Sequence, residues 1–185
     1  GVYYRLMVEH VKRVLADIER VYPDYDAEQG YELAGFVWFQ GWNDMVNGGV
    51  YPSRGEPGGY DAYSEVLTHF IRDVRKDLPA PKLPFVIGVM GQNGSKEPKG
   101  AMLTIQTAQL AMNDVAEFKG NVKTIRTDVL ADKEAERVFP GWQNHFEEWK
   151  KVGSDRPYHY LGSAIWFNRI GKSMGESMLE LIKNQ

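Results

Sequence analysis

The sequence of 185 residues contains no cysteine and only four histidines. The absence of cysteine excludes a disulfide scaffold, thiolate metal sites and cysteine nucleophiles. A cysteine-free chain occurs on either side of a membrane, so the composition leaves the compartment open, with secretion and the periplasm among the alternatives for the full-length protein. No pair of His, Asp or Glu residues has the spacing of a metal site, and we therefore expect no metal.

Long apolar runs and an excess charge of one sign are also missing. The most apolar run, residues 33–39, has the length of a strand and is far shorter than the roughly 20 residues of a membrane span. The 22 basic and 25 acidic side chains give a net charge of −3, so nothing in the charge favours nucleic acid or an anionic membrane as a partner. With 43% hydrophobic residues, the chain is predicted to form a single globular domain over residues 1–185.

The hydrophobic period alternates between that of a helix and that of a strand along the chain. We expect helices at 4–21, 61–78, 101–118 and 164–183, a broken helical segment at 132–153, and buried strands at 33–39, 85–90 and 122–129. Five glycines and two prolines predict a long irregular loop at 47–59. This order favours an α/β fold with three layers, α/β/α, around a parallel sheet. Ligands of such sheets bind beyond the carboxyl ends of the strands.

The most informative segment follows the first predicted strand and reads Trp38-Phe39-Gln40-Gly41-Trp42-Asn43-Asp44. Gly41 would let the backbone approach a ligand closely, and Asn43 would place an amide donor where an oxyanion could be stabilised. The alternative is a simple turn in which the asparagine side chain bonds to its own loop. The spacing alone does not decide between the two.

This segment resembles the Gly-x-Asn-Asp block of SGNH hydrolases, and residues 35–41 are similar to the Val-x-Trp-Tyr-Gln-Gly element of their sialate O-acetylesterase and carbohydrate acetylesterase branch. Residues 158–164, Tyr-His-Tyr-Leu-Gly-Ser-Ala, are similar to the catalytic histidine block of the same branch. The resemblance implies an SGNH-type domain with a flavodoxin-like sheet. It also implies a serine esterase that removes acetyl groups from a carbohydrate, such as sialic acid or a polysaccharide, without a cofactor.

The resemblance assigns roles to individual residues. Asn43 would donate to the oxyanion, with Gly41 adding close approach or a backbone N–H, and His159 would be the general base. Gln40 would line the same pocket, and Trp42 would stack on a sugar ring, although tryptophan is more often a core residue. The other three histidines have structural interpretations, in helices or in the segment 141–150.

The orienting acid departs from the family pattern. SGNH hydrolases place it three residues before the histidine, where this chain has Arg156, which cannot accept a hydrogen bond from imidazole. Asp155, four residues before His159, is therefore the candidate, with Asp128 as the second choice. The alternative is that Asp155 is a solvated loop residue paired with a neighbouring cation.

The nucleophile departs further, because no serine follows a buried strand in a Gly-x-Ser context. We interpret the chain as the C-terminal part of a longer domain, N-terminally incomplete, whose first strand and nucleophilic serine lie upstream of Gly1. On this interpretation the chain alone is inactive and the upstream segment is its partner. The alternative is a non-catalytic carbohydrate-binding domain of the same fold, in which His159 and Asp155 are structural.

Overall fold

The computed structural model describes residues 1–184. Its sheet has three parallel strands in the order β1-β2-β3, namely β1 (Phe36–Trp38), β2 (Phe85–Val89) and β3 (Val122–Arg126). Phe36 pairs with Phe85, and Phe85 pairs with Val122, so the three strands start in register. The central strand is buried along its whole length. The predicted α/β fold with a parallel sheet is confirmed.

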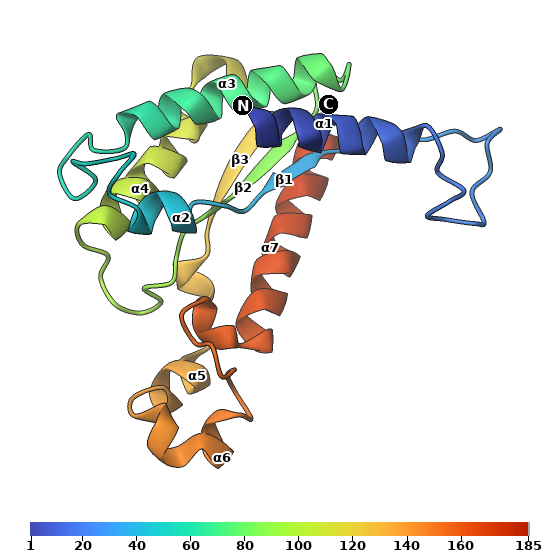
Figure 1. The fold of residues 1–185 in the computed structure, drawn as a ribbon. Helices are drawn as coiled ribbons and strands as arrows, with labels where there is room; N and C mark the ends of the chain where they lie inside the picture. The colour runs from blue at the N-terminus through green and yellow to red at the C-terminus, as the bar shows by residue number, and fades with distance from the viewer. Residues whose placement is uncertain (185) are drawn as a thin grey trace.

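Helices cover both faces of this sheet (Figure 1). The helices α1 (Val2–Leu15), α3 (Asp61–Asp77) and α4 (Ala101–Leu110) pack on one face, and α7 (Ala164–Lys183) packs on the other. Side chains of β2 alternate between the layers, because Phe85 and Ile87 join the core under α1, α3 and α4, whereas Val86 joins the core under α7. The expected three layers are therefore present.

The close approach of α7 to the sheet depends on a glycine in the central strand. A Cβ atom at Gly88 would lie 2.3 Å from Cε of Met174 in α7 and 2.5 Å from Cδ2 of Phe39. Both distances are far below a carbon–carbon contact, so a larger residue at position 88 would push α7 or the end of β1 away. This places α7, and the segment that precedes it, directly against the carboxyl end of the sheet.

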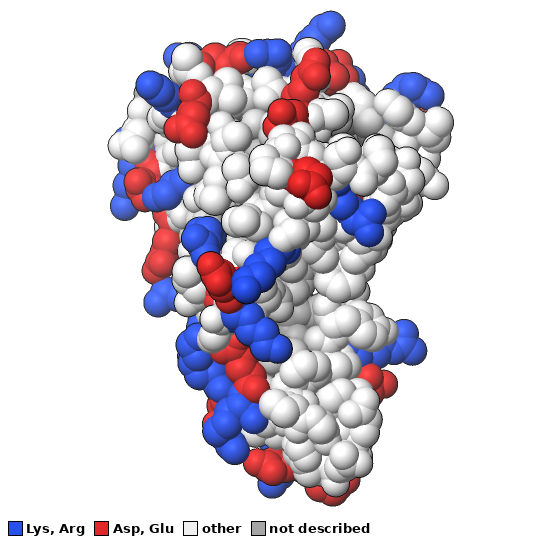
Figure 2. All heavy atoms as spheres, turned by 90° about the vertical axis from the view of Figure 1, so that its left-hand side faces the viewer, with Lys and Arg blue, Asp and Glu red and all other residues white. Residues whose placement is uncertain are grey.

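Residues 131–158 form a small lobe below the sheet, with the helices α5 (Lys133–Val138) and α6 (Phe146–Trp149) (Figure 1). Its centre is Trp149, which is fully buried and donates from Nε1 to the carbonyl of Ser154 at 2.7 Å. The predicted break at Pro140-Gly141 separates α5 from a 3₁₀ turn at Trp142–His145. In Figure 2, acidic and basic side chains intermingle, and the surface is hollowed between the sheet-bearing body and the lobe.

Several predicted boundaries were wrong. The first helix ends at Leu15 rather than at residue 21, because the chain enters successive turns there and Val21 stays 57% exposed. The predicted helix 101–118 stops as an α-helix at Leu110 and continues as two separate 3₁₀ turns. The predicted strand 33–39 forms a ladder only over Phe36–Trp38.

The third strand is also shorter than predicted. It ends at Arg126, since the next side chain, Thr127, donates to the carbonyl of Val89 at 2.5 Å and the chain turns into a 3₁₀ helix at Asp128–Leu130. No helix within residues 1–184 combines the length and the apolar composition needed to cross a membrane.

Candidate active site

A glycine at the end of β1 sets the direction of the first candidate segment. Gly41 precedes the short helix α2 (Trp42–Val46) and has φ 148°, a conformation that other residues rarely adopt. A Cβ atom there would also lie 2.9 Å from Cγ of Met90. The turn therefore requires glycine, and it places Trp42 and Asn43 in the first turn of α2, beyond the carboxyl end of the sheet.

The Asn43 side chain is available to a ligand. It is exposed, and within residues 1–184 its amide has no hydrogen-bond partner; only its backbone carbonyl is used, accepting from the N–H of Asn47 at 2.9 Å. The alternative in which the amide closes its own loop is therefore not what the structure shows. An unengaged amide donor at a strand end can bind an oxyanion or a hydroxyl.

A buried glutamine ties this segment to the central strand. Gln109 of α4 donates from Nε2 to the carbonyl of Gln40 at 2.9 Å and accepts the N–H of Met90 at 2.8 Å. Gln106, one turn earlier, donates to the carbonyl of Met90 at 2.7 Å. Neither residue was predicted for the site, although two glutamines three residues apart in a helix without charged side chains are a signal for buried polar contacts.

The second candidate segment is anchored next to the first. Tyr160 is buried, and its hydroxyl accepts the N–H of Gly91 at 3.1 Å and lies 3.0 Å from Oγ1 of Thr127. Burial raises the pKa of Tyr160 to about 12. Both Tyr160 and Leu161 have positive φ, 51° and 58°, which turns the chain sharply just after His159. Tyr160 thus fixes the histidine segment above the ends of β2 and β3.

These two segments meet in a cavity of about 480 Å³ at the carboxyl edge of the sheet. The rings of Trp42 and His159 are 4.8 Å apart, with their planes at 67°. Five of the six residues that we predicted for the site therefore share one cavity. Its lining consists of Phe39, Gln40, Gly41, Trp42, Asn43, Met90, Gln92, His159, Tyr160 and Phe167.

The sixth predicted residue, Asp155, lies elsewhere. It is exposed, does not line the cavity, and makes no hydrogen bond or ion pair with the rest of residues 1–184. Asp128 is buried and engaged, since Nε of Arg126 donates to its Oδ1 at 2.7 Å. Burial alone would raise the pKa of Asp128, but the hydrogen bonds from Arg126 lower it overall. In this structure, neither carboxylate contacts His159.

No serine lines the described cavity. The two serines nearest to His159 in the chain have structural partners. Ser154 Oγ accepts the N–H of Arg156, and Ser163 caps α7 by accepting the N–H of Trp166 while donating to buried Asp132 at 2.5 Å. The lining of the described cavity therefore contains an imidazole and an exposed amide but no serine hydroxyl.

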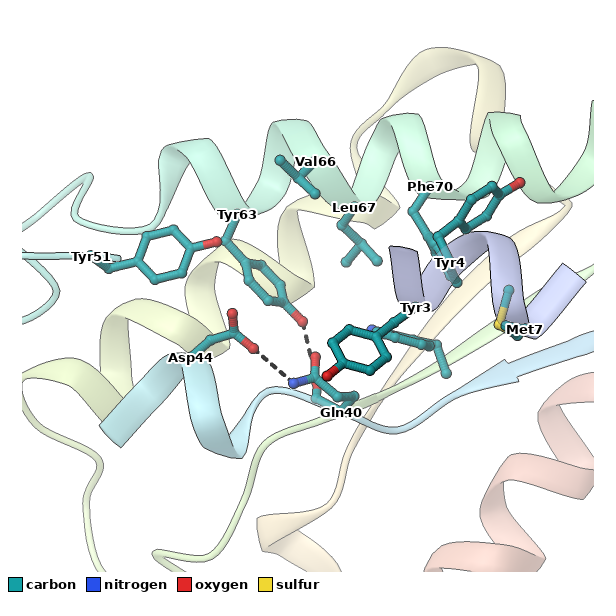
Figure 3. Close-up of a pocket in the computed structure, with 11 residues that line it drawn as sticks. Tyr3, Tyr4, Met7, Gln40, Asp44, Tyr51, Tyr63, Val66, Leu67 and Phe70 are labelled. Atoms are coloured by element: carbon teal, nitrogen blue, oxygen red, sulfur yellow. Dashed lines mark hydrogen bonds between the residues drawn. The ribbon is translucent and has the colours of Figure 1, made fainter. Parts of the chain in front are cut away.

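A neighbouring cavity of about 380 Å³ lies between α1, α3 and the end of β1 (Figure 3). Gln40 lines both cavities. Its side-chain Nε2 donates to Oδ2 of Asp44 at 2.8 Å, while its backbone carbonyl accepts the hydroxyl of Tyr63 at 3.3 Å. The Gln40 side chain is therefore held by Asp44, and residues of α1 and α3 make this second cavity mainly apolar.

Comparison with protein families assigns the chain to a family. The family model described as carbohydrate esterase, sialic acid-specific acetylesterase matches residues 3–140. The chain belongs to this family. The match of the sialic acid-specific acetylesterase model includes the segment from Gln40 to Asn43 and ends before His159. No match to the chain was found among curated proteins or among solved structures.

Proposed function

We propose that this member of the carbohydrate esterases is a serine esterase that removes O-acetyl groups from a sugar, with His159 as the general base and Asn43 as an oxyanion donor. One observation carries the proposal: Asn43 and His159, 116 residues apart in the chain, line one cavity at the carboxyl edge of the sheet. Family membership supports the reaction class, and the geometry supports the roles of these two residues.

The proposed reaction follows acyl transfer through a serine. His159 takes the proton of the serine hydroxyl as its oxygen attacks the acetyl carbonyl carbon, and the negative charge that develops on the carbonyl oxygen is held by the Asn43 amide and the backbone near Gly41. The bond to the sugar oxygen then breaks, and His159 returns the proton to that oxygen. Water hydrolyses the acetyl-serine in the same way and releases acetate. Trp42 and Gln40 would contact the sugar.

We assign the two remaining catalytic roles, the nucleophile and the orienting acid, to groups that do not line the cavity. We place the nucleophilic serine in a segment outside residues 1–185, because the cavity lining contains no serine. We retain Asp155 as the acid that orients His159, because Asp128 is already paired with Arg126. Asp155 has no competing partner, and the segment before Pro157 contains no regular helix or strand that would prevent its carboxylate from turning towards the ring.

The test uses the full-length protein that contains this chain. His159→Ala should reduce hydrolysis of 4-nitrophenyl acetate and of an acetylated sugar by about 10³-fold or more, because the base is lost at both steps. The matched control is His69→Ala, which removes an exposed histidine of α3. Near-normal turnover by His159→Ala would end the assignment.

A carbohydrate-binding domain without catalysis is the second candidate. The absence of a serine from the lining of the described cavity favours it. Trp42 would then be the main contact to the glycan, and His159 its neighbour in the same wall. The two candidates predict different results for the full-length wild-type protein, because a binder retains acetylated sugar without releasing acetate, whereas an esterase releases it.

A further inference from the structure

A third cavity, of about 430 Å³, lies on the other side of Gln92 from the candidate active site. The two cavities share Gln92, and the segment after His159 lines both, with Tyr160 in the first and Leu161 in the second. The two cavities are therefore adjacent, and the third one is lined in part by residues of the α5–α6 lobe. The lining of the third cavity consists of Gln92, Asn93, Ser95, Lys96, Glu136, Arg137, Phe139, Pro140, Leu161 and Trp166.

The amide of Gln92, the residue that lines both cavities, is buried without a hydrogen-bond partner in the part of the chain that the structure describes. Both amide atoms of Gln92 are buried, and neither has a hydrogen-bond partner within residues 1–184. An amide in this state destabilises the folded chain, and buried side-chain amides are normally satisfied. A ligand that draws the Gln92 amide into either cavity would supply the missing partners.

The remaining lining includes apolar surface that suits the face of a sugar ring. Phe139 and Pro140, at the end of α5, add apolar surface, which is what the C–H face of a sugar packs against. Two charged side chains of the wall are paired, because Glu136 accepts from the N–H of Ser95 at 2.6 Å and Arg137 donates to Glu134 at 2.7 Å. Lys96 is exposed to solvent.

We infer that the third cavity binds the sugar unit next to the acetylated one, and that Gln92 hydrogen-bonds hydroxyl groups at the junction. The natural substrate is then an acetylated oligosaccharide or polysaccharide rather than a free monosaccharide. This inference rests on the proposed function, since it assumes that the acetylated unit occupies the cavity of Asn43 and His159.

The first test compares chain lengths in the full-length enzyme. The substrates are acetylated mono- and tetrasaccharides of xylose, N-acetylglucosamine and sialic acid. For the sugar that the enzyme prefers, the tetrasaccharide should have at least a 10-fold higher kcat/KM than the monosaccharide. Phe139→Ala should remove most of this advantage and leave the monosaccharide unchanged. The matched control, Phe146→Ala, removes a phenylalanine of the same lobe that lies outside the three cavities described. Equal kcat/KM for both lengths in all three series overturns the inference.

A second variant does not depend on the packing of Phe139. Gln92→Leu should raise the melting temperature by about 2–4 °C, because the unsatisfied amide is removed, and should weaken binding of the preferred tetrasaccharide by about 10-fold. Unchanged binding overturns the inference. Binding is read with the unacetylated tetrasaccharide, by ligand-detected NMR, so it is independent of catalysis. If the tetrasaccharide binds through Gln92 but no ester is hydrolysed, only the proposed esterase function fails.

Discussion

The indole of Trp42 and the imidazole of His159 form an edge-to-face pair with ring centroids 4.8 Å apart, although the two residues are 117 positions apart in the chain. His159 is exposed, and no hydrogen bond within residues 1–184 holds its ring, so this contact and that with Tyr158 at 5.2 Å limit its orientation. Trp42 is therefore expected to position the proposed base as well as to contact the sugar.

Trp42→Ala should lower kcat of the full-length enzyme by about 2–10-fold on 4-nitrophenyl acetate, because an aromatic pair contributes about 0.5–1.5 kcal/mol. This substrate has no sugar, so the effect reports the positioning of His159 alone. Trp42→Phe keeps a ring in the same place and should retain most of the activity. Equal losses for alanine and phenylalanine would contradict a role for the ring contact.

Asn43→Ala should lower kcat by roughly 10²–10³-fold with little change in KM, because the amide is expected to bind the oxygen only once it carries negative charge. The control is Asn47→Ala at the end of the same helix, whose side chain accepts the N–H of Gly49 and faces no cavity described. Steady-state kinetics on an acetylated sugar measure both variants. A loss confined to KM would mean that Asn43 contacts the ground state only.

The stability of the chain should fall between pH 10 and pH 12. Burial raises the pKa of Tyr63 and Tyr160 from 10.0 to about 12, so over this interval the unfolded chain loses phenolic protons that the folded chain keeps. The free energy of unfolding therefore decreases as the pH rises. Tyr160→Phe should make this decrease shallower by about 1.4 kcal/mol per pH unit, measured by urea unfolding. An unchanged slope would mean that Tyr160 ionises in the folded state.

Gln109→Met should destabilise the fold by about 2–3 kcal/mol, because it leaves the buried N–H of Met90 without its acceptor and removes the closer of the two donors to the backbone carbonyl of Gln40. The exposed Thr107→Ala, on the opposite side of the same helix, should change the free energy of unfolding by less than about 0.5 kcal/mol. Urea unfolding at neutral pH compares the two. Similar values for both variants would show that the Gln109 bridge is not important for stability.

The order of helices and strands could be predicted because the long helices α1, α3 and α7 have a clear helical period and the strands β1 and β2 are short apolar runs. The final helix runs from Ala164 to Lys183 as the pattern indicates. The juxtaposition of Asn43 and His159 followed from family resemblance and from the rule that strand ends share an edge. Helix ends were less predictable, since Val21 continues the apolar spacing of α1 yet finds no surface to pack on.

The supporting contacts could not be read from the sequence. Gln109 and Tyr160 bond to backbone groups 19 and 69 residues away, and such pairings exist only once the layers have packed. The position of Asp155 could not be read either, because its segment contains no periodic pattern. The long loop at 47–59, by contrast, was expected from its glycines and prolines, and it contains no regular helix or strand.

The turn after β2 connects the two halves of the candidate site. The N–H of Met90 donates to Gln109, which also bonds to the segment that carries Asn43, and the N–H of Gly91 donates to the hydroxyl of Tyr160, which follows His159. Two consecutive peptide groups thus anchor both the segment that carries the Asn43 amide and the segment that carries the His159 imidazole. We therefore expect a change of the backbone at 90–91 to displace the Asn43 segment and the His159 segment together.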